Sequence, residues 1–173
     1  PGHPWQHMND LDILKSAGLY IKDFQSGQEG LTLAAILLFG KDEVIRSVLP
    51  HFKTDAIKRV ENTDRYDDRD DIRTNLIESL DRLMIFISKH LSDKFYLEDT
   101  LRKSLRDNIF REVATNLLIH REYSNAFPAK LIIEADRVIT ENANKPHGFG
   151  QIDPTDFVPF PKNFAIVQVF KEM

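Results

Sequence analysis

The stretch RDNIFREVATNLLIHREYS, residues 106–124, decides how this chain folds. At about 100° per residue, its apolar side chains fill one broad arc, which predicts a single helix with one face in the core. The apolar residues are Ile109, Phe110, Val113, Ala114, Leu117 and Leu118. A polar row also follows the helix, because Glu112, Asn116 and His120 recur at four-residue steps. Ile109 and Val113 fall among them on the wheel, so we expect the row to border the core.

Polar side chains at the edge of a core need partners, since an unpaired buried polar group costs roughly 1–3 kcal/mol. The row can form an internal hydrogen-bond network that pins the helix to the strands after it, with Arg121 or Arg137 as the charged partner. It can also face a ligand, because a carboxylate one turn from an amide can hold a water-activating base beside a ligand of Mg²⁺. The residues alone leave both interpretations open.

Composition narrows the class of protein. The chain has 173 residues, 42% of them hydrophobic and 29% charged, which suits one globular domain or two small subdomains sharing a core. A net charge of -4 and a pI near 5.9 do not fit a dedicated nucleic-acid-binding module, which would be basic. The absence of cysteine excludes disulfides, thiolate metal sites and a cysteine nucleophile. We expect a protein of the reducing cytoplasm.

No apolar run reaches the roughly 18 residues of a membrane span, so we expect no membrane partner. Residues 1–8 have no charged region followed by an apolar stretch, so they do not form a secretory signal. We interpret residues 1–8 as an expression-vector remnant and leave them out of the fold prediction.

The hydrophobic pattern predicts an α+β fold, because helices and strands are mixed without regular βαβ alternation. The predicted helices cover residues 71–90 and 106–124, a short segment from Asn9 or Asp10 to Gly18, residues 43–49, and a stretch capped by Asn163. The predicted strands cover residues 31–39, 56–60, 129–134 and 137–141, with a short hairpin at 95–97 and 101–103. For residues 31–39 a buried helix is the alternative, but the short length and the flanking glycines favour a strand. Residues 142–161, with four prolines, are predicted to form a long loop.

Two subdomains follow from this pattern: a front α/β piece at residues 9–62 and a back helix and sheet piece at residues 71–173. The acidic segment between them, residues 63–70, is predicted to be a linker. Its run of aspartates has the composition of a divalent-cation site, but arginines interleave with the charges and no calcium-loop pattern is present. A solvated loop is therefore favoured, in which Asp70 and Asp71 cap the next helix.

The pattern Glu112-x-x-x-Asn116-x-x-x-His120-Arg121-x-Tyr123-Ser124, followed by residues 129–134 and 136–139, resembles the C-terminal part of a bacterial family. These are RecG-related proteins, with a Schlafen-type AlbA-like domain, described as DNA-binding transcriptional regulators. The resemblance runs from about residue 11 to the end of the chain. It implies a divergent GHKL ATPase, the fold class of histidine kinases, gyrase B and Hsp90, in a C-terminally truncated form.

The resemblance also implies roles for individual residues, with ATP and Mg²⁺ as the cofactors. Glu112 would deprotonate the attacking water, and Asn116 would hold Mg²⁺ against the phosphates. The other implied nucleotide-binding residues are His120, Arg121, Asn142, Gly148 and Gly150. Asn142-Ala143-Asn144 departs from the Asn-Pro-Gly turn of the family and from the adenine-reading Asp of classical members. No G-x-x-x-x-G-K-[ST] motif is present, so a helicase motor cannot reside in this chain.

Two functions from different classes remain open. The first is an ATP-binding regulatory domain, for which hydrolysis of ATP stays open, with nucleotide as its partner and DNA reached only through a domain outside this chain. The second is a non-catalytic interaction module that has kept the scaffold, with partner burial of residues 153–161 as its expected sign. A homo-oligomer is compatible with both. Direct DNA binding by this chain ranks third because of its acidic balance.

Overall fold

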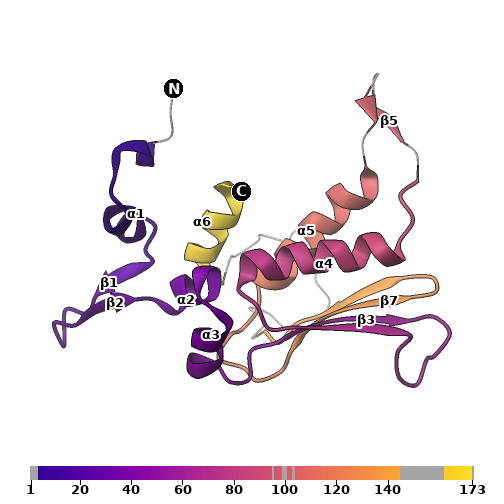
Figure 1. Ribbon diagram of the computed structural model, residues 1–173, viewed down its shortest axis with the longest axis horizontal. Helices are drawn as coiled ribbons and strands as arrows, with labels where there is room; N and C mark the ends of the chain where they lie inside the picture. The colour runs from indigo at the N-terminus through magenta and orange to yellow at the C-terminus, as the bar shows by residue number, and fades with distance from the viewer. Residues whose placement is uncertain (1–3, 95, 99–100, 103, 145–161, 173) are drawn as a thin grey trace, which may run out of the picture.

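The computed structural model describes residues 4–94, 96–98, 101–102, 104–144 and 162–172. It confirms the predicted α+β class, with six α-helices and three β-sheets in the described residues (Figure 1). Two of the sheets are two-stranded hairpins, and the third has four strands. The candidate site lies on the helix layer of this four-stranded sheet.

The four-stranded sheet has the order β4-β3-β7-β8, from β4 (Asp68–Ile72), β3 (Thr54–Arg59), β7 (Ala129–Glu134) and β8 (Val138–Glu141). Strand β3 runs antiparallel to β4 and parallel to β7, while β7 and β8 form the predicted antiparallel hairpin. Because β3 belongs to the segment 9–62 and β7 to the segment 71–173, one sheet joins both segments.

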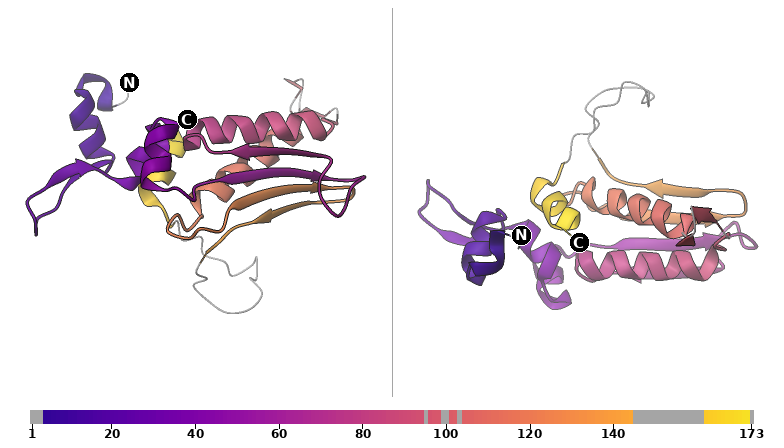
Figure 2. Two further views of the ribbon diagram at one scale, coloured as in Figure 1. Left: turned by 60° about the horizontal axis from the view of Figure 1, so that its bottom comes forward. Right: turned by 90° about the horizontal axis from the view of Figure 1, so that it is seen from above.

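Helices α4 (Leu76–His90) and α5 (Leu105–Ile119) make the crossover between β3 and β7, and both lie on the same side of the sheet (Figures 1 and 2). A strand alternates its side chains between the two faces, so β3 and β7 present Ala56, Leu131 and Ile133 to these helices. The helices bury Leu80, Leu83, Ile87, Ala114 and Leu118 against them. This apolar layer fixes the rotation of α5 about its own axis.

The N-terminal part contains a 3₁₀ helix (Pro4–His7), α1 (Asp10–Ser16), and a ribbon of β1 (Tyr20–Lys22) and β2 (Glu29–Leu31). Asn9 caps α1 as predicted, accepting from the Asp12 N–H at 2.9 Å. Trp5, within the segment read as a vector remnant, packs against the hydrophobic core. The ribbon projects away from the sheet, as Figure 2 shows.

Three further helices cover the end of the sheet: α2 (Leu33–Phe39), α3 (Asp42–Val48) and α6 (Phe164–Glu172). Helix α2 packs on α4 and α6 and buries Ala35, Leu37 and Leu38. The predicted strand at residues 31–39 is therefore wrong for this segment. Thr32 caps the helix by accepting from the Ala35 N–H, and leucine and alanine are strong helix formers.

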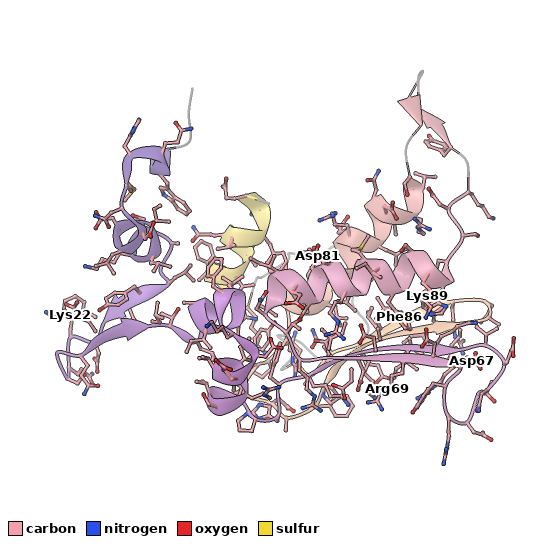
Figure 3. The ribbon with its side chains drawn as sticks, in the orientation of Figure 1. Lys22, Asp67, Arg69, Asp81, Phe86 and Lys89 are labelled. Carbon is pink, nitrogen blue, oxygen red and sulfur yellow. The ribbon has the colours of Figure 1, made fainter. Side chains whose placement is uncertain are left out.

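The acidic run also differs from the prediction. Asp68–Ile72 form the edge strand β4, and α4 begins only at Leu76, with Asn75 in place of Asp70 and Asp71 as its cap. The charges are tolerated in a strand because partners hold them: Arg82 binds Asp70, and Lys89 and His90 each lie 2.7 Å from the Asp68 Oδ2. Figure 3 labels Lys89 on α4, above the strands. Lys89, and then His90, hold the pKa of Asp68 at about 2.

The remaining predicted elements are confirmed with shifted bounds. They are α3, the hairpin of β5 (Leu97–Glu98) and β6 (Leu101–Arg102), helix α5, and helix α6. Helix α5 ends at Ile119, with His120 as its C-cap residue. Residues 120–124 therefore leave the helix, and this changes what His120, Arg121 and Tyr123 can contact.

Candidate functional site

The first half of the predicted site, Glu112 and Asn116, lies on the exposed face of α5. The expectation that this row borders the core is wrong for these two residues, because the buried arc of α5 is centred on Ala114, Leu117 and Leu118. Ile109, which the prediction placed inward beside them, is 56% exposed. Glu112 and Asn116 therefore share one solvent-facing strip, one helical turn apart.

Neither side chain has a hydrogen bond or ion pair with another described residue. The internal network predicted for the row does not form, since Arg137 binds Glu134 at 2.7 Å and Arg121 binds backbone carbonyls. His120 is half-buried at the end of the helix, and its ring likewise has no hydrogen-bond partner among the described residues. The carboxylate, amide and imidazole of the row are thus available to a ligand.

Arg121, in contrast, is almost fully buried, with 1% of its surface exposed. Its guanidinium donates to the backbone oxygens of Lys53 at 2.6 Å and Phe127 at 3.3 Å. The group lies 5.3 Å from the ring centre of Phe52 and 5.4 Å from that of Tyr123, in cation–π range. Burial lowers the pKa of Arg121, and no carboxylate of the described residues pairs with it. The structure therefore places Arg121 in the core and not at a ligand surface.

The last carbonyl groups of α5 explain the positions of several other predicted residues. These oxygens have no partner within a helix and need one from outside. The Leu117 oxygen accepts from the Asn142 amide at 2.8 Å, and the Leu118 oxygen accepts from the Tyr123 hydroxyl at 2.8 Å. Asn163 donates to the oxygen of Ile119 at 2.8 Å and to that of Arg121 at 2.9 Å. We call Arg121, Tyr123, Asn142 and Asn163 the capping corner.

An ion pair holds the outside of the capping corner. Lys162 Nζ lies 3.0 Å from Glu122 Oε2 and also bonds the side chain of Asn144. The hydroxyl of Ser124 and then Lys162 hold the pKa of Glu122 below its usual value. The backbone N–H of Glu122 donates to the Ala143 oxygen at 2.9 Å. The chain after β8 and the chain before α6 are therefore both fastened to the end of α5.

Sequence reasoning singled out Asn142 and Asn163 for other roles, as an adenine contact and as a helix cap. Asn142 uses its amide N–H on α5, while its Oδ1 is buried without a partner among the described residues. Gly148 and Gly150, and most of the predicted loop 142–161, lie outside the described residues. Within the described ranges, no cluster of three or more His, Asp or Glu side chains could hold a metal ion.

A cavity of about 430 Å³ lies at the other end of the helix layer, away from the predicted site. Its walls come from the turn after α4, the start of α5 and the β7–β8 turn, with Leu91, Phe110 and Val138 as apolar lining and Arg106 and Arg137 as cations. None of the predicted site residues that the structure describes lines it. Sequence reasoning missed this cavity because its walls come from separate segments, none with a recognisable motif.

Comparisons with known proteins inform the fold and leave the activity open. The model of a domain of unknown function, DUF8451, matches residues 1–55, which include residues 1–8. The crystal structure of the DIP2311 protein from Corynebacterium diphtheriae is similar at a TM-score of 0.62 and 17% identity. The matched region covers 97% of this chain and 33% of the DIP2311 chain, so this chain spans about a third of that protein. No curated protein matches the chain.

The similarity to the DIP2311 protein concerns the fold alone. Among the described helices, none is long and apolar enough to cross a membrane.

Proposed function

We propose that this chain is an ATP-binding, GHKL-like regulatory part of a RecG-related cytoplasmic protein that reaches DNA through a domain outside residues 1–173. One observation carries the proposal: Glu112 and Asn116 stand one turn apart on the exposed face of α5, free of hydrogen bonds to other described residues. Because no contact of the described fold uses them, this exposed carboxylate and amide can bind a ligand at no cost to the fold.

The chemistry of the two groups fits Mg²⁺ and a polyphosphate. Mg²⁺ in nucleotide sites is bound through few protein oxygens, with phosphates and waters as its other ligands. The Asn116 side-chain oxygen would be such a ligand, and Glu112 would accept the proton of the attacking water. His120, at the end of the same row, would lie toward the phosphates. Arg121 and the Asn142 amide are held by the capping corner, so we leave both out of the proposed nucleotide contacts.

The experiment is a titration of the chain with ATP, with and without Mg²⁺, followed by backbone amide shifts. We expect saturable, Mg²⁺-dependent shifts at Glu112 and Asn116 that Asn116→Ala removes. Asn108→Ala is the matched control, because Asn108 is an exposed amide on the same helix, about two turns from Asn116. Absence of shifts at millimolar ATP, or equal shifts in both variants, would contradict the proposal.

Hydrolysis is tested separately, through the water-activating role of Glu112. Glu112→Gln keeps the shape of the side chain and removes the proton acceptor, so it should preserve Mg²⁺–ATP affinity and abolish turnover in the intact protein. Turnover equal to that of the unchanged protein would remove Glu112 from the mechanism while leaving ATP binding in place.

The second candidate, a non-catalytic interaction module, is favoured by the projecting ribbon. Phe24, at the turn of the ribbon, is 91% exposed, and Ile21 and Leu31 on its two strands are also exposed. Asp23 fixes the turn by accepting from the Gln25 N–H at 2.9 Å and from the Ser26 hydroxyl at 2.5 Å. Such an ordered apolar tip is typical of a contact surface. Under this reading Phe24→Ser would abolish assembly, while Asn116→Ala would have no effect.

A further inference from the structure

The two edges of the four-stranded sheet carry different side chains. In β4, residues 68–71 are all charged, and ion pairs with neighbouring elements hold them; Arg69, for example, lies 2.7 Å from Asp55. Charged residues of this kind keep an edge strand from pairing with another chain. In β8, the first three residues, Val138, Ile139 and Thr140, are uncharged and suited to strands. The β8 edge therefore lacks the protection that β4 has.

The backbone of β8 also offers hydrogen-bonding groups. The Glu134 N–H donates to the Arg137 oxygen at 2.9 Å, which starts the β7–β8 ladder. Antiparallel pairs alternate between bonded and non-bonded, so Ile139 and Glu141 bond to β7, and the N–H and C=O groups of Val138 and Thr140 point away from it. Among the described residues, nothing pairs with these outward groups.

We propose that the β8 edge pairs with the β8 edge of a second copy of this chain, antiparallel, with Ile139 opposite Ile139. In this register Val138 of each copy lies opposite Thr140 of the other, so the outward N–H and C=O groups meet in two bonded pairs. The two four-stranded sheets become one continuous sheet across a two-fold axis, which is an isologous contact.

The charges of Arg137 and Glu141 favour this strand register over the two registers shifted by one step. With Ile139 opposite Ile139, Arg137 lies opposite Glu141 at both ends of the contact, giving two pairs of opposite charge. A shift by one step in either direction keeps the backbone pairing, but it places Glu141 opposite either Ile139 or Ala135 and leaves Arg137 without a carboxylate opposite. The short sequence of residues 137–141 is thus complementary to itself when it runs antiparallel.

Ile139, whose side chain lies on the sheet face opposite α4 and α5, adds apolar contact to the same interface. Ile57, Ile132 and Ile139 lie side by side across β3, β7 and β8, on the face opposite α4 and α5. Ile57 and Ile132 are 6% and 3% exposed, and neither belongs to the core beneath the helices. In the paired state Ile139 of one copy meets Ile139 of the other, and the row of isoleucines runs through both sheets. Glu112 and Asn116 are on the helix layer, so this proposal does not depend on nucleotide binding.

The first test is sedimentation of the 173-residue chain and of two charge-reversed variants. We expect a dimer whose dissociation constant rises about tenfold or more in Arg137→Glu and in Glu141→Arg, because each variant alone places two like-charge pairs in the contact. Mixing the two variants should restore the dimer, since the heterodimer has opposite charges at both ends. This recovery separates the interface from the intrachain pairs with Glu134 and Lys130, which mixing leaves unchanged. A monomer up to about 1 mM, or dimers indifferent to both reversals, would overturn the proposal.

The second test uses the absence of cysteine in the chain. Directly opposed non-bonded residues in antiparallel strands have Cα atoms about 4.5 Å apart, within the range of a disulfide. Ile139→Cys should therefore oxidise to a covalent dimer, while Ile85→Cys, the same change at an exposed position on α4, should stay monomeric under the same conditions. Equal cross-linking of the two variants would overturn the register.

Discussion

The polar groups of α5 and those just beyond its C-terminus differ in their contacts. On the helix itself, Glu112 and Asn116 are exposed and have no partner among the described residues. Just after it, Arg121 and the rest of the capping corner are bonded to backbone carbonyls and largely shielded from water. The stretch from Glu112 to Ser124 therefore contains two kinds of residue. The first kind can bind a ligand, whereas the second holds the end of the helix.

The largest expected effect is that of Arg121→Ala. This change leaves a void beside Phe52 and removes the hydrogen-bond donor of the backbone oxygens of Lys53 and Phe127. We expect the free energy of unfolding, measured by urea denaturation, to fall by about 3 kcal/mol or more. Arg111→Ala, at an exposed position on α5, is the control and should change it by less than about 0.5 kcal/mol. Similar losses of unfolding free energy in Arg121→Ala and Arg111→Ala would mean that the buried arginine stabilises the fold no more than an exposed one.

A smaller decrease in the free energy of unfolding is expected from Asn163→Ala. This change leaves the oxygens of Ile119 and Arg121 without their common donor, and we expect a cost of roughly 1–3 kcal/mol. Amide exchange should locate the effect, with faster exchange in the last turn of α5 and at the start of α6. Asn108→Ala, which removes an exposed amide with no hydrogen-bond partner in the described part of the chain, should leave both exchange and stability unchanged.

Acid should weaken the capping corner through Glu122. Its folded pKa is lowered, so the stability it contributes is full above its unfolded pKa and is lost as the pH falls through the lower, folded value. The pair with Lys162 is partly exposed, so we expect no more than about 1 kcal/mol. Unfolding curves of the unchanged chain and Glu122→Gln should converge below this window and differ above it. A constant difference at every pH would assign the effect to something other than this ionisation.

The smallest effect on stability is expected where the largest effect on ligand binding is proposed. Asn116→Ala and Glu112→Gln remove exposed groups that no other described residue contacts by hydrogen bond or ion pair, so each should shift the free energy of unfolding by less than about 0.5 kcal/mol. Thermal unfolding without nucleotide is the measurement. A loss of more than about 1 kcal/mol in either variant would mean that these groups bear on the fold, as the capping corner does.

Much of the fold could be read from periodicity. The alternation at residues 129–141 predicted the β7–β8 hairpin, and the apolar arc of residues 109–118 predicted helix α5. Residues 33–39 were different, because a nearly continuous apolar run has no period that separates a buried strand from a buried helix. Strand β4 was missed because its charged residues look like a loop until their partners on α4 are known.

The candidate site was less predictable, because burial depends on elements far away in the sequence. The helical wheel placed Ile109 in the apolar arc, but α5 is rotated by its contact with β7, which leaves Ile109 exposed and Asn116 facing solvent. Asn163 was predicted to cap its own helix, yet its side-chain amide donates to the Ile119 oxygen at the end of α5 and to the Arg121 oxygen just after it. Sequence spacing showed which residue types recur on α5, and only the packed structure showed which of them are already bonded.

The parallel pairing of β3 with β7 also constrains how the protein forms on the ribosome. Thr54 pairs with Ala129, so β3 emerges long before its central neighbour exists. At about 5–20 residues per second, the β3–β4 hairpin waits for several seconds with one side open, while α4 and α5 are still being made. During that interval the edge of β3 that will pair with β7 has no strand beside it. Translation speed between residues 60 and 134 should therefore govern the yield of folded protein more than speed elsewhere in the chain.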